Sequence, residues 1–171
     1  MKSEIRVIQE KFTRAEAKIV QAEIRMSPDI VGYSYNELLK MENVFKAYCV
    51  DEFVGSCTNF DFGRNWTELS AFIVREKFRG SGVGSKLFSA AWIDAEKRAK
   101  HIFILSRNPS MVKIFLNSGM TIINSFRHLP AQIKAKSYKP ATSSYRFKEF
   151  IRKLPMKKSG KFIFGVKLAK F

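Results

Sequence analysis

Three glycines at alternate positions, Gly80, Gly82 and Gly84, separate a strand-like run from a helix-like one in the stretch REKFRGSGVGSKLF of residues 75–88. Glycine costs about 1 kcal/mol relative to alanine inside a helix, so this spacing indicates a need for bare backbone. The first amides of a helix lack intrahelical partners and carry the positive end of the helix dipole. A phosphate can approach them closely when side chains are absent. The stretch therefore predicts an anion-binding loop.

The order of the residues excludes two common phosphate-binding motifs. A Walker loop needs glycine followed directly by lysine, whereas here Ser85 separates Gly84 from Lys86. The dinucleotide fingerprint GxGxxG fails because Leu87 occupies the position of its last glycine.

The same residues fit a third pattern, [Gln/Arg]-x-x-Gly-x-[Gly/Ala], as RGSGVG at residues 79–84. This resembles the acyl-coenzyme A motif of the GNAT N-acyltransferase superfamily. Further on, NPSMVKIFLNSGM at residues 108–120 resembles the Asn-x-x-Ala-x-x-Leu-Tyr-x-x-x-Gly-Phe stretch of that family, at the usual separation. The resemblance is specific for about residues 44–126, plausible for residues 1–43 and thin beyond residue 126.

The order of predicted elements agrees with this resemblance. Strands are expected at residues 5–10, 44–50, 53–62, 66–74, 101–106, 121–126 and 161–171. Helices are expected after the capping pairs Thr13/Glu16 and Ser34/Glu37, from the glycines to about residue 100, after Asn108, and at residues 143–154. We therefore expect one α/β domain over residues 1–171. The resemblance implies a mixed, mostly antiparallel sheet, flanked by helices and splayed between its fourth and fifth strands.

The resemblance also implies the cofactor, acetyl-coenzyme A, and its contacts. The pantetheine arm would lie in the gap between the splayed strands and pair with backbone atoms of Phe72, Ile73 and Val74. The Phe72 N–H would polarise the acyl carbonyl. The Asn108 side chain would bond the arm, although it also fits a plain helix N-cap. Phe115 would contact the cofactor. The pyrophosphate would be held by the backbone amides of Arg79, Gly80, Ser81, Gly82, Val83, Gly84 and Ser85.

For the general base the resemblance points to Glu68, six residues before Val74, as in some family members. Strand alternation predicts that residues 68, 70, 72 and 74 share one face, which would place Glu68 beside the cofactor gap. A carboxylate there could take the proton of the attacking amine directly or through water. The alternative is a solvated strand glutamate with no catalytic role.

One departure from the family concerns the leaving group. Phe115 stands where the family has a tyrosine that often protonates the departing thiolate. Ser110, Ser118, Cys57 or a tyrosine from elsewhere could replace it. A module that binds acyl-coenzyme A without turnover is a further alternative.

Charge is concentrated at one end of the chain. The net charge is +16, and residues 127–171 contribute +12 of it, with Glu149 as their one acid. Such a surface favours a neutral or anionic amine acceptor over a polycation. A nucleic-acid or ribosome contact through this segment is the competing interpretation, because Tyr138, Tyr145 and Phe147 alternate with basic residues.

Cysteine, histidine and hydropathy patterns limit the remaining function classes. The two cysteines, Cys49 and Cys57, and the two histidines do not fit a familiar metal site, so we expect buried thiols and no metal. No apolar run approaches the roughly 20 residues of a membrane span, and the charged start contains no signal-peptide core. We expect a soluble cytoplasmic protein.

Overall fold

The computed structural model describes residues 4–30, 32–137, 143–158 and 160–169. Both predicted capping boxes are present. The Thr13 hydroxyl accepts from the Glu16 amide at 3.2 Å, and the Glu16 carboxylate accepts from the Thr13 amide at 2.7 Å, at the start of α1 (Arg14–Met26). Ser34 and Glu37 repeat this arrangement at α2 (Tyr35–Leu39). Each box satisfies amides that the first turn leaves unpaired.

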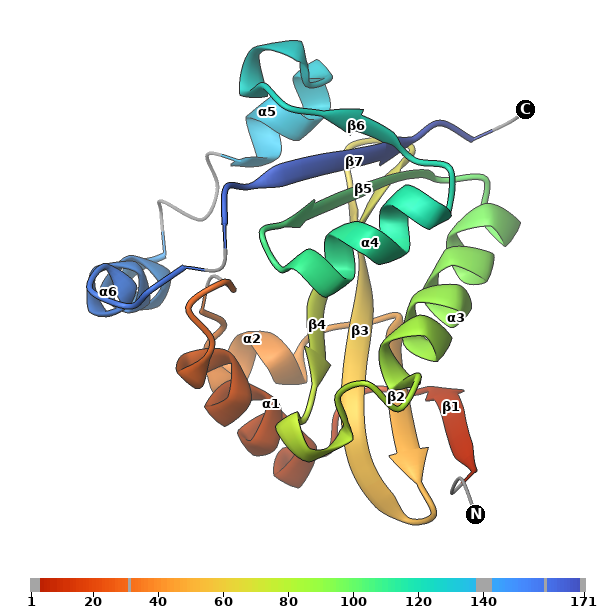
Figure 1. Ribbon diagram of the computed structural model, residues 1–171, viewed down its shortest axis with the longest axis vertical. Coiled ribbons are helices and arrows are strands. Elements are labelled where there is room, and N and C mark those ends of the chain that lie inside the picture. The colour runs from red at the N-terminus through yellow and green to blue at the C-terminus, as the bar shows by residue number, and fades with distance from the viewer. Residues whose placement is uncertain (1–3, 31, 138–142, 159, 170–171) are drawn as a thin grey trace.

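One mixed sheet of seven strands organises the described residues, in the order β1-β2-β3-β4-β5-β7-β6 (Figure 1). Neighbours pair antiparallel except β4 and β5, which run parallel. This confirms the expected mixed, mostly antiparallel sheet. The strands are β1 (Ile5–Gln9), β2 (Val44–Cys49), β3 (Glu52–Phe62), β4 (Trp66–Val74), β5 (His101–Ser106), β6 (Thr121–Ile123) and β7 (Ile163–Lys167).

The parallel pair separates soon after it begins. Ladder pairing between β4 and β5 is confined to Trp66 with His101, Thr67 with Ile102 and Glu68 with Phe103. Beyond Glu68 the two strands diverge, as Figure 1 shows. The remainder of β4 therefore presents an edge that β5 does not cover.

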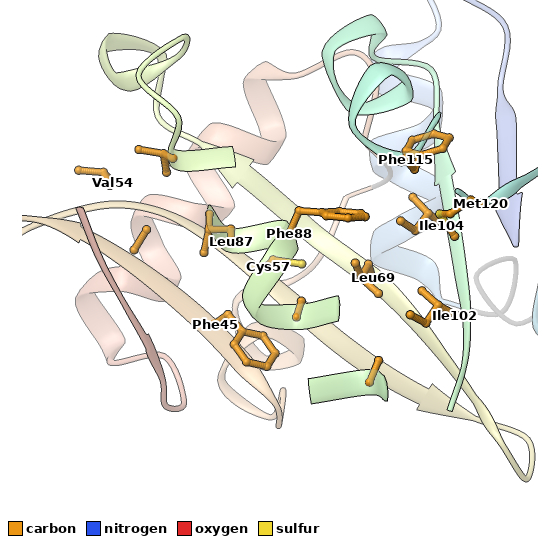
Figure 2. Close-up of a cluster of buried hydrophobic side chains, with 14 residues drawn as sticks. Phe45, Val54, Cys57, Leu69, Leu87, Phe88, Ile102, Ile104, Phe115 and Met120 are labelled. Carbon is orange, nitrogen blue, oxygen red and sulfur yellow. The ribbon is translucent and has the colours of Figure 1, made fainter. Parts of the chain in front are cut away.

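Helices cover both faces of the sheet. On one face, α3 (Val83–Lys97) and α4 (Pro109–Asn117) pack over a core that includes Leu69, Leu87 and Phe115 (Figure 2). On the other face, α1 and α2 bury a second cluster that includes Val20, Leu38 and Ile73. Gly55 of β3 allows close strand packing, because a Cβ there would lie 2.5 Å from the Ile73 carbonyl oxygen.

The C-terminal part completes the sheet and adds two helices. β7 inserts between β5 and β6, which the sequence did not predict. α6 (Ser144–Lys153) matches the expected basic helix, while α5 (Ala131–Ser137) and the 3-10 turns η1 (Glu76–Phe78) and η2 (Phe126–His128) were not predicted. The expected strands at 121–126 and 161–171 are shorter, because β6 ends at Ile123 and β7 spans Ile163–Lys167.

Helix α6 turns its polar side inward. Glu149 and Lys153 are buried, whereas Phe147, Phe150, Ile151 and Leu154 are exposed. The Lys153 ammonium donates to the carbonyls of Ile24 and Ile30 at the end of α1 and in the loop that follows it. Lys153 therefore binds the N-terminal half of the chain with two of its donors.

No helix in the described parts of the chain is both long and apolar enough to cross a membrane. Cys49 is half-buried and Cys57 is buried, and both are free thiols.

Candidate active site

The glycine loop leads into α3 with the geometry that an anion requires. Gly82 is the N-cap of α3, and Gly80 and Gly82 have φ angles of +81° and +92°, a region that favours glycine. A Cβ added at either residue would meet no atom within 4 Å, so the backbone faces open space. The Cβ of a larger residue at Gly84 would contact Phe72, Val74 and Ile114 at 3.8 Å. The loop thus lies over the uncovered end of β4.

Two amides of the predicted loop already form backbone hydrogen bonds, and the others are available to a ligand. The amides of Arg79 and Ser81 donate to the carbonyls of Glu76 and Phe78 in η1, at 3.1 and 3.4 Å. The remaining amides of the predicted set form no backbone hydrogen bond with a described residue: Gly80, Gly82, Val83, Gly84 and Ser85. Arg79 contributes structurally as well, since its Nε donates to the Val74 carbonyl at 3.2 Å. The available donors therefore cluster at the first turn of α3.

A β-bulge interrupts β4 beside the gap. Between the pairs Ser56–Ile73 and Thr58–Ser70, one residue of β3 faces two of β4, Ala71 and Phe72. Ala71 has a φ of +46°, a left-handed conformation that costs a non-glycine residue about 1–2 kcal/mol. Bulges of this kind are frequent next to active sites, where they redirect backbone groups.

The bulge corrects one expectation about the faces of β4. Residues 68, 70, 72 and 74 do not share a face, because the extra residue shifts the alternation. Phe72 and Val74 pack with the α3 side of the sheet, whereas Ser70 lies against Tyr33 on the α1 and α2 side. Glu68 also lies on this second side, where it meets α5. The base candidate and the strand-end residues therefore reach the gap from opposite faces.

A cleft of about 150 Å³ occupies the place where β4 leaves β5. Its walls are β4 from Glu68 to Phe72, the end of β5, the start of α4, the segment between α1 and α2, and Phe162 ahead of β7. Glu68 belongs to the last pair with β5, so it lies where the gap closes. The cleft therefore brings together the general-base candidate, the bulge and Asn108.

Glu68 is held in place by a cation from the C-terminal part. Its carboxylate forms an ion pair with Lys136 of α5, and the two side chains are 19% and 15% exposed. The Lys136 ammonium also lies over the rings of Phe60 and Phe62, 4.7 and 4.5 Å from their centroids. Glu68 is thus a partly buried, paired carboxylate and not the solvated strand residue that the alternative interpretation described.

Tyr33 is the tyrosine that lines the cleft among the described residues. Burial raises the pKa of its hydroxyl, while the Arg146 guanidinium, the Ser70 side chain and the Ala71 backbone act in the opposite direction. Arg146 lies 4.5 Å from the centroid of the ring. Tyr33 is therefore protonated at neutral pH and can donate a hydrogen bond.

The side chain of Phe115 does not line the cleft, and its expected contact with the cofactor stays a prediction. It is fully buried, and its ring packs against Gly165 of β7. Burial of an apolar ring is favourable, because it removes the ring from water. Ile73 and Val83 are also core residues, so they can offer a cofactor only their backbone. Asn108 forms the predicted N-cap: its Oδ1 accepts from the Ser110 and Met111 amides at 3.0 and 3.3 Å.

Two of the alternative proton donors lie in unsuitable places. Cys57 is buried in the core, and burial raises the pKa of its thiol. The Ser118 hydroxyl donates to the Phe115 carbonyl at 2.8 Å, at the far end of α4. Ser110 is exposed at the start of α4. Tyr138, part of the nucleic-acid hypothesis, lies outside the described residues.

Sequence reasoning missed two residues of this site. Lys136 reaches Glu68 because Ile133 of α5 packs in one cluster with Trp66 of β4, a long-range arrangement that no local pattern encodes. One feature of the sequence could have indicated Tyr33. It lies directly before the Ser34 capping box, and that box fixes the backbone at the start of α2.

Comparison with solved structures supports the fold. An Ard1 protein from Thermoplasma volcanium matches with a TM-score of 0.66 and 15% identity, covering 98% of this chain and 99% of that one. Rv2747 from Mycobacterium tuberculosis, solved with CoA and NLQ, gives 0.66 and 11%, covering 96% and 99%. N-acetylglutamate synthase from Neisseria gonorrhoeae, solved with coenzyme A and N-acetyl-glutamate, gives 0.68 and 14%, covering 97% of this chain but 36% of that one.

A comparison with curated protein sequences finds no match. The sequence profile of the Acetyltransferase (GNAT) family, in contrast, matches residues 14–119. This region contains α1, the glycine loop, the bulge and the start of α4. Because it spans more than half of the chain, the protein belongs to the GNAT family of acetyltransferases, whose acyl donor is acetyl-coenzyme A.

Proposed function

We propose that the protein transfers an acetyl group from acetyl-coenzyme A to a primary amine by direct attack. The observation that carries this proposal is the meeting of Glu68 with the Ala71–Phe72 bulge in one cleft, at the point where β4 leaves β5. A thioester carbonyl placed there would have a carboxylate on one side and redirected backbone on the other.

The available amides at the start of α3 would hold the pyrophosphate of the cofactor. Five successive or nearly successive donors at a helix N-terminus favour a doubly charged group through both hydrogen bonds and the dipole. The pantetheine arm would then follow the uncovered edge of β4 from Val74 to Phe72, in the manner of an added strand. The Asn108 amide nitrogen would contact the arm, since only Oδ1 is used in the N-cap.

The chemistry requires a neutral amine and a polarised carbonyl. Glu68 would remove one proton from the ammonium form of the acceptor, directly or through water, and the amine nitrogen would attack the carbonyl carbon. The Phe72 N–H would stabilise the developing oxyanion. As the C–N bond forms, the C–S bond breaks and coenzyme A leaves as a thiolate, and the second proton of the acetylated nitrogen passes to that thiolate or to water.

Tyr33 is our candidate for assisting the leaving thiolate. It lines the cleft and is protonated at neutral pH, unlike Phe115, which has no proton to give and is buried. A coenzyme A thiolate is a stable leaving group with a pKa near that of a cysteine thiol, about 8.5, so a hydrogen bond from Tyr33 or water suffices.

The test is turnover with a panel of amines. Release of coenzyme A, followed with a thiol reagent, and acetylated product, followed by mass spectrometry, should rise together for at least one amine. Tight coenzyme A binding without release from acetyl-coenzyme A for any amine would instead favour the non-catalytic module. Salt-sensitive RNA binding without release would favour the nucleic-acid interpretation.

A further inference from the structure

A second, smaller cavity of about 50 Å³ lies beside the cleft. The two cavities share Asp29, Ile30 and Phe162, so the smaller one forms a side chamber of the larger. Residues of α6 and of the segment that joins α1 to α2 line it. None of the residues assigned above to the cofactor or to proton transfer lines this chamber.

Arg107 is the unusual residue of the side chamber. Its guanidinium carbon stacks 3.6 Å from the centroid of the Phe162 ring. Its Nε is buried without a hydrogen-bond partner, and no described residue forms a hydrogen bond or ion pair with the guanidinium. Burial lowers the pKa of Arg107, while Asp29 acts on it in the opposite direction. Arg107 thus has a rigid fork of donors of which one, Nε, is buried and unpaired among the described residues.

Two other cations surround the chamber, but their donors are already used. The Lys153 ammonium donates to the Ile24 and Ile30 carbonyls. The Lys158 ammonium donates to the carbonyls of Lys153, Leu154 and Met156. Both lysines therefore add positive charge without competing for a ligand. Three cations against one acid, Asp29, make the chamber electropositive.

The rest of the wall is apolar. Phe150 of α6 and Leu154, which caps the end of that helix, are exposed side chains that line the chamber together with Pro28 and Ile30. A guanidinium that lies over an aromatic ring beside apolar walls suits a small anion attached to a hydrocarbon group.

We propose that the side chamber binds the anionic end of the acceptor, a carboxylate or phosphate, through Arg107. The amine of the same molecule would then extend into the cleft toward Glu68, and its apolar part would lie against Ile30, Phe150 and Leu154. This inference rests on the proposed function, because it names the substrate class of that site. It also assigns a role to one positive charge of the chain, because Arg107 would select amines that carry an anion over polycations.

Matched acceptor pairs provide the kinetic test. Leucine and phenylalanine are compared with their carboxamides, and phosphoethanolamine with ethanolamine, at saturating acetyl-coenzyme A. We expect the anionic member of at least one pair to have the higher kcat/KM. Arg107→Gln should reduce this value about 10- to 100-fold, the worth of a hydrogen bond to a charged group, and leave the neutral member unchanged. Arg107→Lys should rescue the loss only partly, because lysine lacks the planar fork.

Lys157→Gln is the matched control, since it removes the same charge from an exposed position just after α6. Its acceptor preference should equal that of the parent. The inference is overturned if neutral members are used as well as anionic ones, or if Arg107→Gln and Lys157→Gln behave alike. If Arg107→Gln lowers kcat/KM only with carboxylated acyl donors such as succinyl-coenzyme A, the inference is also overturned, because the anion would then belong to the acyl group.

A binding measurement separates this inference from the proposed function. In protein labelled with ¹⁵N-arginine, the Nε–Hε signal of Arg107 is assigned by its loss in Arg107→Lys. Titration with N-acetyl-leucine should shift this signal saturably, and N-acetyl-leucinamide should not. A shift without turnover of any amine would contradict the proposed function alone. Turnover without anion preference and without a shift would contradict the inference alone.

Discussion

Glu68 of β4 and Lys136 of α5 form a partly buried ion pair at the closed end of the cleft. The base candidate comes from the segment that matches the family profile, whereas its partner comes from the basic C-terminal part outside that match. The aromatic rings of Phe60 and Phe62 frame the ammonium. The C-terminal part therefore contributes directly to the site.

Removing one member of this pair should destabilise the fold. Lys136→Gln leaves the Glu68 carboxylate partly buried without its cation, which should lower the free energy of unfolding by about 1–3 kcal/mol. The double variant Lys136→Gln/Glu68→Gln should lose less than the sum of the two single variants, because neither side chain then remains as an isolated charge. Urea unfolding measures all four proteins. Lys148→Gln, an exposed lysine of α6, is the control. Additive losses would mean that the two residues are not coupled.

Gly82→Leu should abolish coenzyme A binding. The side chain would cover the amides that open at the start of α3, and φ near +92° would strain any residue with a Cβ. Isothermal calorimetry gives the affinity and thermal unfolding gives the cost of strain. Gly119→Leu is a matched control, because Gly119 also has a positive φ, +73°, and no atom within 4 Å, but lies at the end of α4. Similar loss of binding in both variants would show that strain, not the site, is responsible.

Tyr33→Phe should slow turnover about tenfold or more while leaving KM for acetyl-coenzyme A nearly unchanged. The ring that packs against Arg146 remains, so the variant removes only the hydroxyl beside Ser70 and Ala71. Tyr35→Phe, at the first residue of α2, is the control for a lost hydroxyl elsewhere. If Tyr33→Phe melts at the same temperature as the parent, a lower kcat in steady-state kinetics is an effect on the chemical step and not on stability. Full activity of Tyr33→Phe would leave water as the proton donor.

Lys153 should make stability depend on pH in the alkaline range. Burial lowers its pKa from 10.5 to about 8 in the folded protein. Between these values the unfolded chain binds more protons at this residue, so its contribution to stability rises with pH. The melting temperature of the parent minus that of Lys153→Met should therefore increase from about pH 7 to about pH 10. A flat or falling difference would mean that the two carbonyl partners keep the ammonium charged.

Local patterns predicted most of the elements that position the cofactor side. The capping boxes at Thr13 and Ser34, the N-cap at Asn108 and the glycine loop depend on neighbours within a few residues, so the sequence displays them directly. The pairing of β2 with β3 and of β3 with β4 follows from the short connections between these alternating strands.

The acceptor side could not be predicted in the same way. The bulge at Ala71 has no residue signature, because alanine rarely adopts a positive φ, and it reversed the expected face of Phe72 relative to Glu68. Helix α5 and the insertion of β7 depend on pairing across long stretches of chain, and with them come Lys136 and Phe162. Long-range packing decided which polar residues meet.

The most direct test of amine acetylation in this cleft is the rate of acetyl transfer by Glu68→Gln, measured with the best acceptor of the amine panel. Glutamine keeps the shape of the side chain and cannot take a proton. We predict a fall in kcat of about 100-fold or more, with coenzyme A affinity unchanged by calorimetry, and no effect of Glu96→Gln on the exposed side of α3. A Glu68→Gln variant as active as the parent would contradict the assignment of Glu68 as the general base.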